Sequence, residues 1–173
     1  GWAAGNLRSP LRLSVFLVSC LSRAPRRSPD WLDEGGCFVV NTSMPDIVLA
    51  TLNAKYSHPA FGLRYLLANL GPLRNRATLL EFDIKRKPAE VVSAILEQNP
   101  KIVGLGVYIW NVVPLTGVVT ALKRERPDIL IVLGGPEVSF EEDQPDVCRL
   151  VDFVIAGEGE MAFAELCNQL LWA

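Results

Sequence analysis

The chain of 173 residues is long enough for one domain with a buried core and short for two. Half of its residues are hydrophobic, 21% are charged, and the net charge of −2 leaves no basic stripe of the kind that binds nucleic acid. Its four cysteines show no Cys-x-x-Cys spacing, which argues against a zinc ribbon or a dithiol redox motif, and no apolar run reaches the roughly 18 residues of a membrane span.

The first 43 residues differ in composition from the rest of the chain. They contain five arginines, no lysine and three acidic residues, and Arg12 interrupts the apolar run 11–21. This composition is typical of an upstream extension, a mis-set translation start or a targeting segment. We expect residues 1–43 to be poorly ordered and residues 44–173 to form the domain.

From Met44 onward, apolar β-branched runs alternate with segments whose apolar residues recur at helical spacing. Gly71-Pro72 is typical of a helix end, and Pro88 of a helix start. The pattern predicts strands at 46–52, 77–83, 101–108, 128–133 and 151–156. It predicts helices at 59–70, 88–98, 112–126 and 160–171.

The third and fourth predicted strands are apolar nearly throughout, which is typical of a parallel sheet buried on both faces. With right-handed crossovers, the alternation predicts a doubly wound α/β fold, Rossmann-like or flavodoxin-like. We expect five parallel strands in the order 2-1-3-4-5. A ligand crevice would then lie at the carboxyl ends of strands one, three and four.

Two of the loops at that edge carry unusual side chains. The loop 53–59 is polar and holds His58, the single histidine of the chain. Tyr108, Trp110 and Asn111 follow the third strand, where two large aromatic rings either cover a flat ligand or cap the core.

Glycines mark the other two loops. Gly134-Gly135 after the fourth strand lets the backbone approach a ligand, or forms a tight turn. Gly157 and Gly159 precede a helix whose N-terminus favours polar or anionic ligands, or they only shape the helix entry. The Gly-x-Gly-x-x-Gly pattern of a nicotinamide-binding fold does not follow the first strand, which disfavours NAD binding. The Gly-x-Gly at 104–106 lies inside the third strand, where it permits close helix packing or the approach of a ligand.

Taken together, these loops resemble the cobalamin-binding domain found in front of radical S-adenosylmethionine (SAM) enzymes. The resemblance covers residues 44–172. It is carried by Ala50-Thr51-Leu52-Asn53-Ala54-Lys55-Tyr56-Ser57-His58, Gly104-Leu105-Gly106-Val107-Tyr108-Ile109-Trp110-Asn111, Leu133-Gly134-Gly135-Pro136-Glu137-Val138-Ser139 and Ala156-Gly157-Glu158-Gly159-Glu160-Met161-Ala162-Phe163.

The resemblance implies where the cofactor lies. The nucleotide tail of cobalamin would follow the glycine loop of strand four and pass Gly157, and the corrin ring would rest over the loops of strands one and three. The residues that this implies for cofactor binding are Leu52, Asn53, Tyr56, Ser57, His58, Tyr108, Trp110, Asn111, Gly134, Gly135, Pro136, Glu137, Ser139, Gly157, Glu158 and Gly159.

The loop after strand one departs from the Asp-x-His-x-x-Gly of cobalamin mutases and methionine synthase, in which the histidine bonds cobalt. Here Tyr56 replaces the aspartate, and Gly62 falls one place late. His58 therefore lacks the carboxylate that normally orients the imidazole. We therefore do not predict that a residue of this chain bonds the metal, and we keep His58 only as a candidate ligand of cobalt.

The Cys-x-x-x-Cys-x-x-Cys motif that holds the iron–sulfur cluster of radical SAM enzymes is absent from these 173 residues. The resemblance therefore implies that the cluster, SAM and the catalytic residues belong to a domain beyond Trp172. We expect no activity from this chain alone, a methyl transfer or radical reaction in the partner domain, and a cytoplasmic location without membrane or nucleic-acid partners.

Other functions fit the sequence less well or stay open. A signalling receiver domain needs acidic residues and a lysine where this chain has Asn53, Trp110-Asn111 and Gly157-Glu158. A small enzyme acting on a nucleotide or sugar would need a base–nucleophile pair, and none is evident. A remnant without cofactor, or a small-ligand or nucleotide-binding α/β domain, remains the alternative.

Overall fold

The computed structural model describes residues 44–54, 59–140 and 144–172. They form one five-stranded sheet in which all pairs of neighbouring strands are parallel, in the order β2-β1-β3-β4-β5. The strands are β1 (Ile47–Asn53), β2 (Ala77–Asp83), β3 (Ile102–Gly106), β4 (Leu130–Gly134) and β5 (Phe153–Ile155). The α-helices are α1 (Phe61–Asn69), α2 (Pro88–Leu96), α3 (Val112–Glu125) and α4 (Glu160–Trp172).

The doubly wound fold and its strand order are as predicted from the sequence, and the differences are local. Short 3₁₀ helices that the periodicity does not indicate occur at η1 (Gly71–Arg76), η2 (Pro136–Val138) and η4 (Asp146–Arg149). Strand β3 ends at Gly106, two residues early, and the Tyr108 backbone N–H donates to the side chain of Asn111. The predicted disorder of residues 1–43 concerns a segment outside the described residues.

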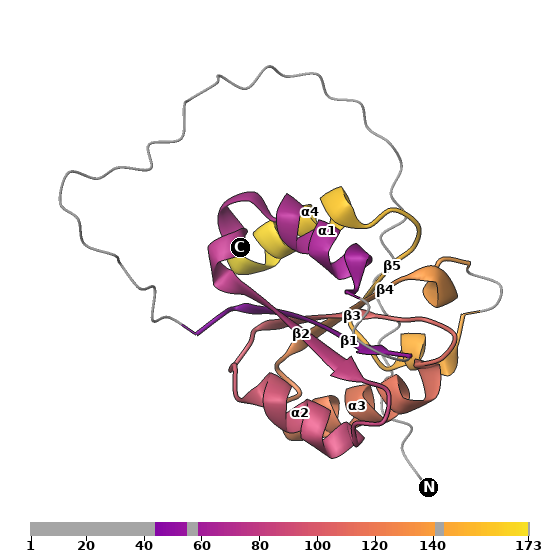
Figure 1. The fold of residues 1–173 in the computed structure, drawn as a ribbon. Helices are drawn as coiled ribbons and strands as arrows, with labels where there is room; N and C mark the ends of the chain where they lie inside the picture. The colour runs from indigo at the N-terminus through magenta and orange to yellow at the C-terminus, as the bar shows by residue number, and fades with distance from the viewer. Residues whose placement is uncertain (1–43, 55–58, 141–143, 173) are drawn as a thin grey trace, which may run out of the picture.

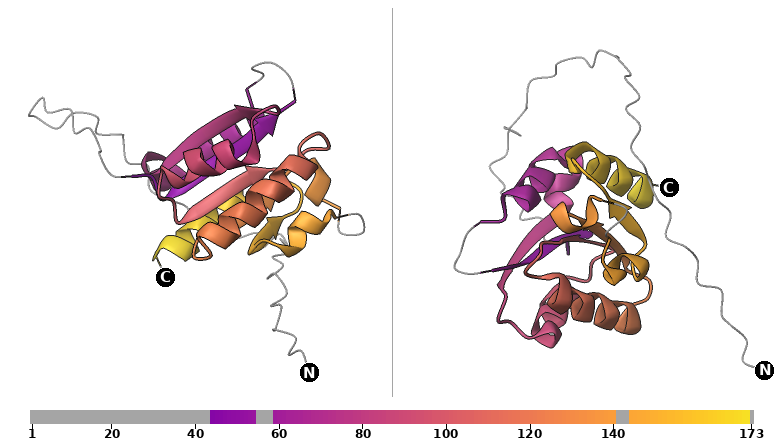
Figure 2. Two further views of the ribbon diagram at one scale, coloured as in Figure 1. Left: turned by 90° about the horizontal axis from the view of Figure 1, so that it is seen from below. Right: turned by 90° about the vertical axis from the view of Figure 1, so that its right-hand side faces the viewer.

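The helices cover both faces of the sheet in pairs. Helices α1 and α4 pack on one face, and α2 and α3 pack on the other (Figures 1 and 2). Each pair closes its own core: Val48, Ala50 and Leu52 of β1 point toward α2 and α3, whereas Ile47 and Leu49 point toward α1 and α4. The alternation of side chains along one strand thus feeds two cores, which explains why the strands are apolar throughout.

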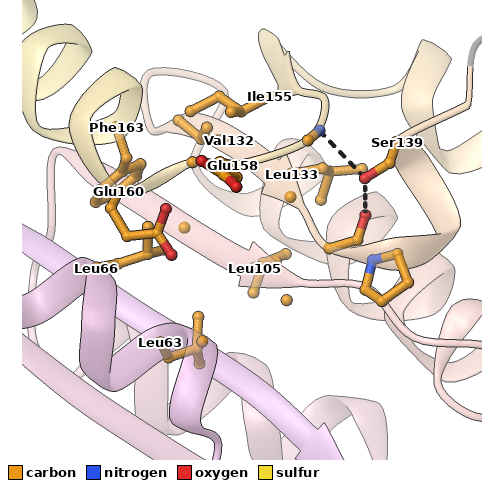
Figure 3. A pocket seen from close by; sticks show the side chains of 18 of the residues that line it. Leu63, Leu66, Leu105, Val132, Leu133, Ser139, Ile155, Glu158, Glu160 and Phe163 are labelled. Carbon is orange, nitrogen blue, oxygen red and sulfur yellow. Dashed lines mark hydrogen bonds between the residues drawn. The ribbon is translucent and has the colours of Figure 1, made fainter.

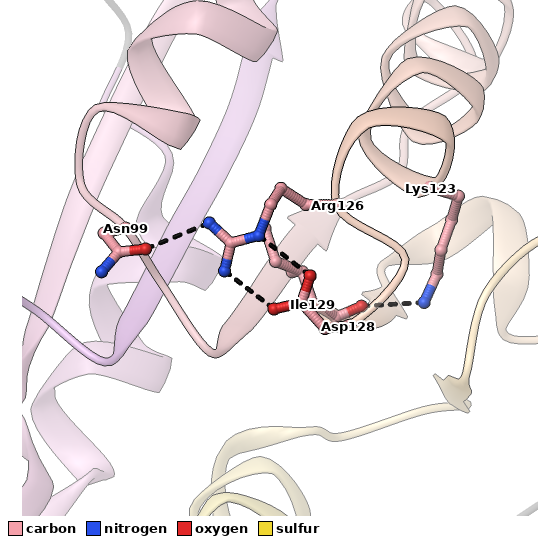
Figure 4. Close-up of polar contacts among 5 residues, drawn as sticks. All are labelled: Asn99, Lys123, Arg126, Asp128 and Ile129. Atoms are coloured by element: carbon pink, nitrogen blue, oxygen red, sulfur yellow. Dashed lines mark hydrogen bonds and ion pairs between the residues drawn. The ribbon is translucent and has the colours of Figure 1, made fainter.

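Ion pairs hold the amino edge of the sheet, opposite the strand tips. The Asp46 carboxylate contacts Arg76 and Lys101, and the hydrogen bond from Arg76 lowers the pKa of this carboxyl. Before β4, Arg126 donates two hydrogen bonds to Asp128 and one to Asn99 (Figure 4). These contacts fix the turns that enter β1, β3 and β4, and they leave the opposite edge to the site.

None of the helices described here combines the length and apolar character needed to cross a bilayer.

Candidate functional site

A strip of glycines leaves the sheet bare beneath α1 and α4. Gly104 and Gly106 are two positions apart on β3, so both lie on the face that α1 and α4 cover. Gly134 pairs with Gly106 on the neighbouring strand. A Cβ atom on Gly104 would lie 2.8 Å from a Leu49 methyl and 3.1 Å from the Phe163 ring. Gly104 therefore admits the close packing of Phe163, and Gly106 admits the Tyr108 ring, which would lie 3.3 Å from a Cβ atom there. A Cβ atom on Gly134 would meet no such close neighbour, so the sheet is open to a ligand at this end of the strip.

That space is a cavity of about 440 Å³ between the sheet and the two helices, at the carboxyl ends of β3, β4 and β5. Apolar side chains from α1, the sheet and α4 form most of its wall: Leu63, Leu66, Val132, Ile155 and Phe163 (Figure 3). The glycine backbone of the two loops also contributes to the wall, as do Tyr108, Ser139, Glu158 and Glu160. A volume of this size and an apolar lining with few polar groups suit a flat organic ligand.

The loop after β4 runs directly against the tip of β3. Gly135 has φ +116°, a conformation that side-chain-bearing residues rarely adopt. A Cβ atom there would lie 3.0 Å from the Val107 nitrogen and closer still to the Val107 carbonyl oxygen. Glycine is therefore required at this position both by conformation and by space.

Ser139 ties the two glycine loops together. Its hydroxyl donates to the Gly135 carbonyl oxygen at 2.9 Å and accepts from the Gly157 N–H at 3.2 Å (Figure 3). Because both of these contacts are internal, the hydroxyl shapes the cavity, and its direct contact with a cofactor tail stays a prediction.

Tyr108 and Trp110 form a rigid pair beside the cavity. Their rings stack with centroids 4.8 Å apart and planes 3° apart, and the indole N–H of Trp110 donates to the Leu52 carbonyl oxygen at 3.1 Å. Tyr108 lines the cavity, and its hydroxyl lies 3.5 Å from the Cβ position of Gly62 at the start of α1. Trp110 backs Tyr108 from outside the cavity lining and is 45% exposed.

Asn111 is fully buried and joins the tips of β1 and β3. Its amide nitrogen donates to the Gly106 and Leu52 carbonyl oxygens and to the Thr51 hydroxyl, at 3.0, 3.2 and 3.3 Å. Its amide oxygen accepts the N–H of Tyr108 at 2.8 Å. The side chain thus serves the strand tips, beneath the loops that the cofactor would meet.

The structure separates the sixteen predicted cofactor residues into three groups. Those that line the cavity are Tyr108, Gly134, Gly135, Pro136, Ser139, Gly157, Glu158 and Gly159. Those outside its lining are Leu52, Asn53, Trp110, Asn111 and Glu137. Tyr56, Ser57 and His58 lie outside the described residues, so the candidate cobalt ligand stays a prediction.

Several lining residues were not predicted from the sequence. Leu63, Leu66 and Phe163 have the spacing of ordinary core positions. Part of their surface faces a cavity because the glycines of β3 and β4 opposite them have no side chain. Gly104-x-Gly106 was the available signal, because glycines two apart on a buried strand leave one face of the sheet bare.

Cys167 lies in the same core, where burial raises the pKa of its thiol to about 12, so the thiol is protonated near neutral pH.

Replacing Trp110 tests whether it holds Tyr108 in place. Trp110→Phe keeps a stacked ring but removes the N–H bond to Leu52, and we expect the free energy of unfolding to fall by about 1 kcal/mol. Trp110→Ala also removes the stack, and we expect a loss of about 2 kcal/mol. Urea unfolding of the purified chain measures both. Phe140→Ala is the control, because Phe140 is 74% exposed; if Trp110→Ala were as harmless as this control, the indole would not support the site.

Comparison with known proteins adds to this geometry. The chain is 37% identical to a cobalamin-dependent radical SAM methyltransferase, TokK, from Streptomyces tokunonensis. The match extends over 82 residues, which are 44% of this chain and 11% of that protein. It is 32% identical to the 2-(S-pantetheinyl)-carbapenam-3-carboxylate methyltransferase of Streptantibioticus cattleyicolor. This match extends over 96 residues, which are 50% of this chain and 14% of that protein. The chain thus matches only a small part of the length of these curated relatives.

A solved structure shares the fold. The chain superposes on a cobalamin-binding protein from Desulfitobacterium hafniense with a TM-score of 0.53 and 25% identity, over 73% of this chain and 59% of that one. Residues 47–167, well over half of the chain, match the family described as "B12 binding domain". The chain therefore belongs to the B12-binding domain family, and its cofactor is cobalamin.

Proposed function

We propose that this domain holds cobalamin at the carboxyl edge of its sheet, as the accessory module of a radical SAM methyltransferase. The nucleotide tail enters the cavity between α1 and α4, and the corrin ring lies outside, over the tips of β1 and β3. The observation that carries the placement is the cavity of about 440 Å³ above Gly104, Gly106 and Gly134.

The residues present fit the tail. Its aromatic base needs a flat apolar slot, and Leu63, Leu66 and Phe163 face the bare strip of sheet across the cavity. The backbone at Gly135 and Gly157 has positive φ angles and no side chain, so a ligand can approach it closely. When bound, cobalamin supplies the cobalt chemistry, and the protein supplies placement and shielding.

The chain's own residues prepare the cavity before any ligand arrives. Ser139 holds the two glycine loops at a constant separation, and Asn111 holds the tips of β1 and β3. Tyr108, backed by Trp110, forms the wall nearest the start of α1. A site that is ordered in advance loses less conformational entropy on binding.

Retention of a corrinoid tests the proposal directly. The 173-residue chain is mixed with hydroxocobalamin, desalted and passed over a sizing column, and we expect the corrin absorption to elute with the protein. Flavin mononucleotide, a nucleotide of another class, should not be retained. Elution of the chain without corrin absorption would contradict the proposal, and retention of the flavin in its place would favour a general nucleotide-binding domain.

The radical SAM partner is supported by the names of the relatives, of which this chain matches a small part. The gene sequence downstream of the codon for Ala173 tests this part of the proposal. A Cys-x-x-x-Cys-x-x-Cys motif in the same reading frame would support it. A stop codon at that point would contradict a partner in the same chain.

A further inference from the structure

The polar side chains that line the cavity are few, and half of them are acidic. Four described residues with polar side chains line it: Tyr108, Ser139, Glu158 and Glu160. The Ser139 hydroxyl is already committed to the two glycine loops. Within the described part of the chain, the two carboxylates have no hydrogen bond or ion pair. The carboxylates can only accept hydrogen bonds, so a ligand beside them should bring donors.

The charge of this lining disfavours a phosphate. The charged groups among the described lining residues are Glu158 and Glu160, and neither lysine nor arginine joins them. A phosphate placed beside two carboxylates would be repelled, most strongly where the walls exclude water. The tail of cobalamin consists of a base, a ribose and a phosphate, and its free hydrogen-bond donors are the ribose hydroxyls.

Glu160 is better placed than Glu158 to meet such a donor. It is the first residue of α4, is partly buried, and its carboxylate lies near Leu66 and Phe163 with its oxygens directed into the cavity (Figure 3). Glu158 is exposed and lies between Gly157 and Gly159, where the backbone is less constrained. A carboxylate beside an apolar wall matches a nucleoside, which presents an apolar ring and hydroxyl donors together.

We propose that Glu160 is a specificity-determining residue, which accepts hydrogen bonds from the ribose hydroxyls of the nucleotide tail. The inference rests on the proposed function and deepens it. The cavity then selects the nucleoside as a unit, base and sugar together, and turns the phosphate away from α4 toward the opening. Corrinoids without a nucleoside lose this contact.

The test compares ligands with and without the nucleoside. Cobinamide has the corrin ring without the nucleotide, so its affinity for the chain should not depend on Glu160. In Glu160→Met, which keeps the length of the side chain without an oxygen, we expect the affinity for hydroxocobalamin to fall about tenfold, because a hydrogen bond to a charged group is lost. The affinity for diaquocobinamide should change less than about twofold. Spectroscopic titration measures both affinities.

Glu165→Met is the matched control, because Glu165 is an exposed residue of the same helix and does not line the cavity. Its affinities for both corrinoids should equal those of the unmodified chain. Equal losses of cobalamin and cobinamide affinity in Glu160→Met, or no loss of either, would overturn the ribose contact. Failure of the unmodified chain to bind hydroxocobalamin would instead refute the proposed function.

A second measurement needs no variant and so does not depend on its folding. α-Ribazole, the free nucleoside of the tail, and its base 5,6-dimethylbenzimidazole compete with hydroxocobalamin for the unmodified chain. If Glu160 binds the ribose, α-ribazole should compete about tenfold better than the base. Equal competition by the two compounds would show that the sugar contributes nothing and would overturn the inference.

Discussion

Gly135→Ala should lower the free energy of unfolding by about 3–4 kcal/mol and the affinity for hydroxocobalamin at least about tenfold. The added Cβ would meet the Val107 backbone, 3.0 Å from its nitrogen and closer to its carbonyl oxygen, at a φ of +116° that alanine rarely adopts. Backbone cannot move aside as a side chain can, so the loop after β4 must shift away from the tip of β3. Urea unfolding measures the stability, and corrinoid titration measures the affinity.

Gly71→Ala separates backbone strain from damage to the site. Gly71 has φ +54°, but no atom lies within 4 Å of its Cβ position, and it begins η1 before β2, away from the cavity. We expect this control to lose about 1 kcal/mol of stability and none of the cobalamin affinity. If Gly135→Ala behaved like Gly71→Ala, the close approach of the glycine loop to β3 would not matter for binding.

The second large effect is expected for Asn111→Asp, which should cost about 3–5 kcal/mol near neutral pH. The two side chains have nearly the same shape, but the change replaces a donor by an acceptor where three oxygen atoms receive hydrogen bonds, those of Thr51, Leu52 and Gly106. The loss should be smaller at about pH 4 than at about pH 8, because a protonated carboxylic acid regains one donor. Urea unfolding at the two pH values measures this difference.

Asn69→Asp is the control for that change. The Asn69 side chain also donates to a carbonyl oxygen, that of Tyr65, but it is exposed, so water can replace the lost partner. We expect a loss below about 1 kcal/mol. Should Asn111→Asp be equally mild, the hydrogen bonds at the strand tips would not determine the stability of the site.

The sequence was sufficient to predict the architecture. The strand β3 is apolar on both faces, and the alternation of strands with helices leaves few ways to cover both sides of a sheet, so the parallel order 2-1-3-4-5 could be predicted before the structure. The boundaries were harder, because a strand end depends on local competition for hydrogen bonds. At β3 the Asn111 side chain takes the N–H of Tyr108, and no periodicity indicates this.

Part of the site was likewise visible in the sequence. Glycines at the end of strand four and in the loops after strands four and five meet at one edge, so Gly134, Gly135, Gly157 and Gly159 could be expected together, and all four line the cavity. The resemblance to cobalamin-binding domains rests on these same loops, and the family match agrees with it.

Only the tertiary structure decided the roles of the side chains around those glycines. A sequence shows that Trp110, Asn111 and Ser139 are polar or aromatic groups near strand ends, but not where their hydrogen bonds go. In the folded chain these bonds reach residues up to 60 positions away, as from Asn111 to Thr51, and bind the loops to one another. Such partners depend on the packing of the whole sheet, because the strands that meet at its edge are distant along the chain. The same packing exposes Leu63, Leu66 and Glu160 to a cavity that exists only where Gly106 and Gly134 lie side by side.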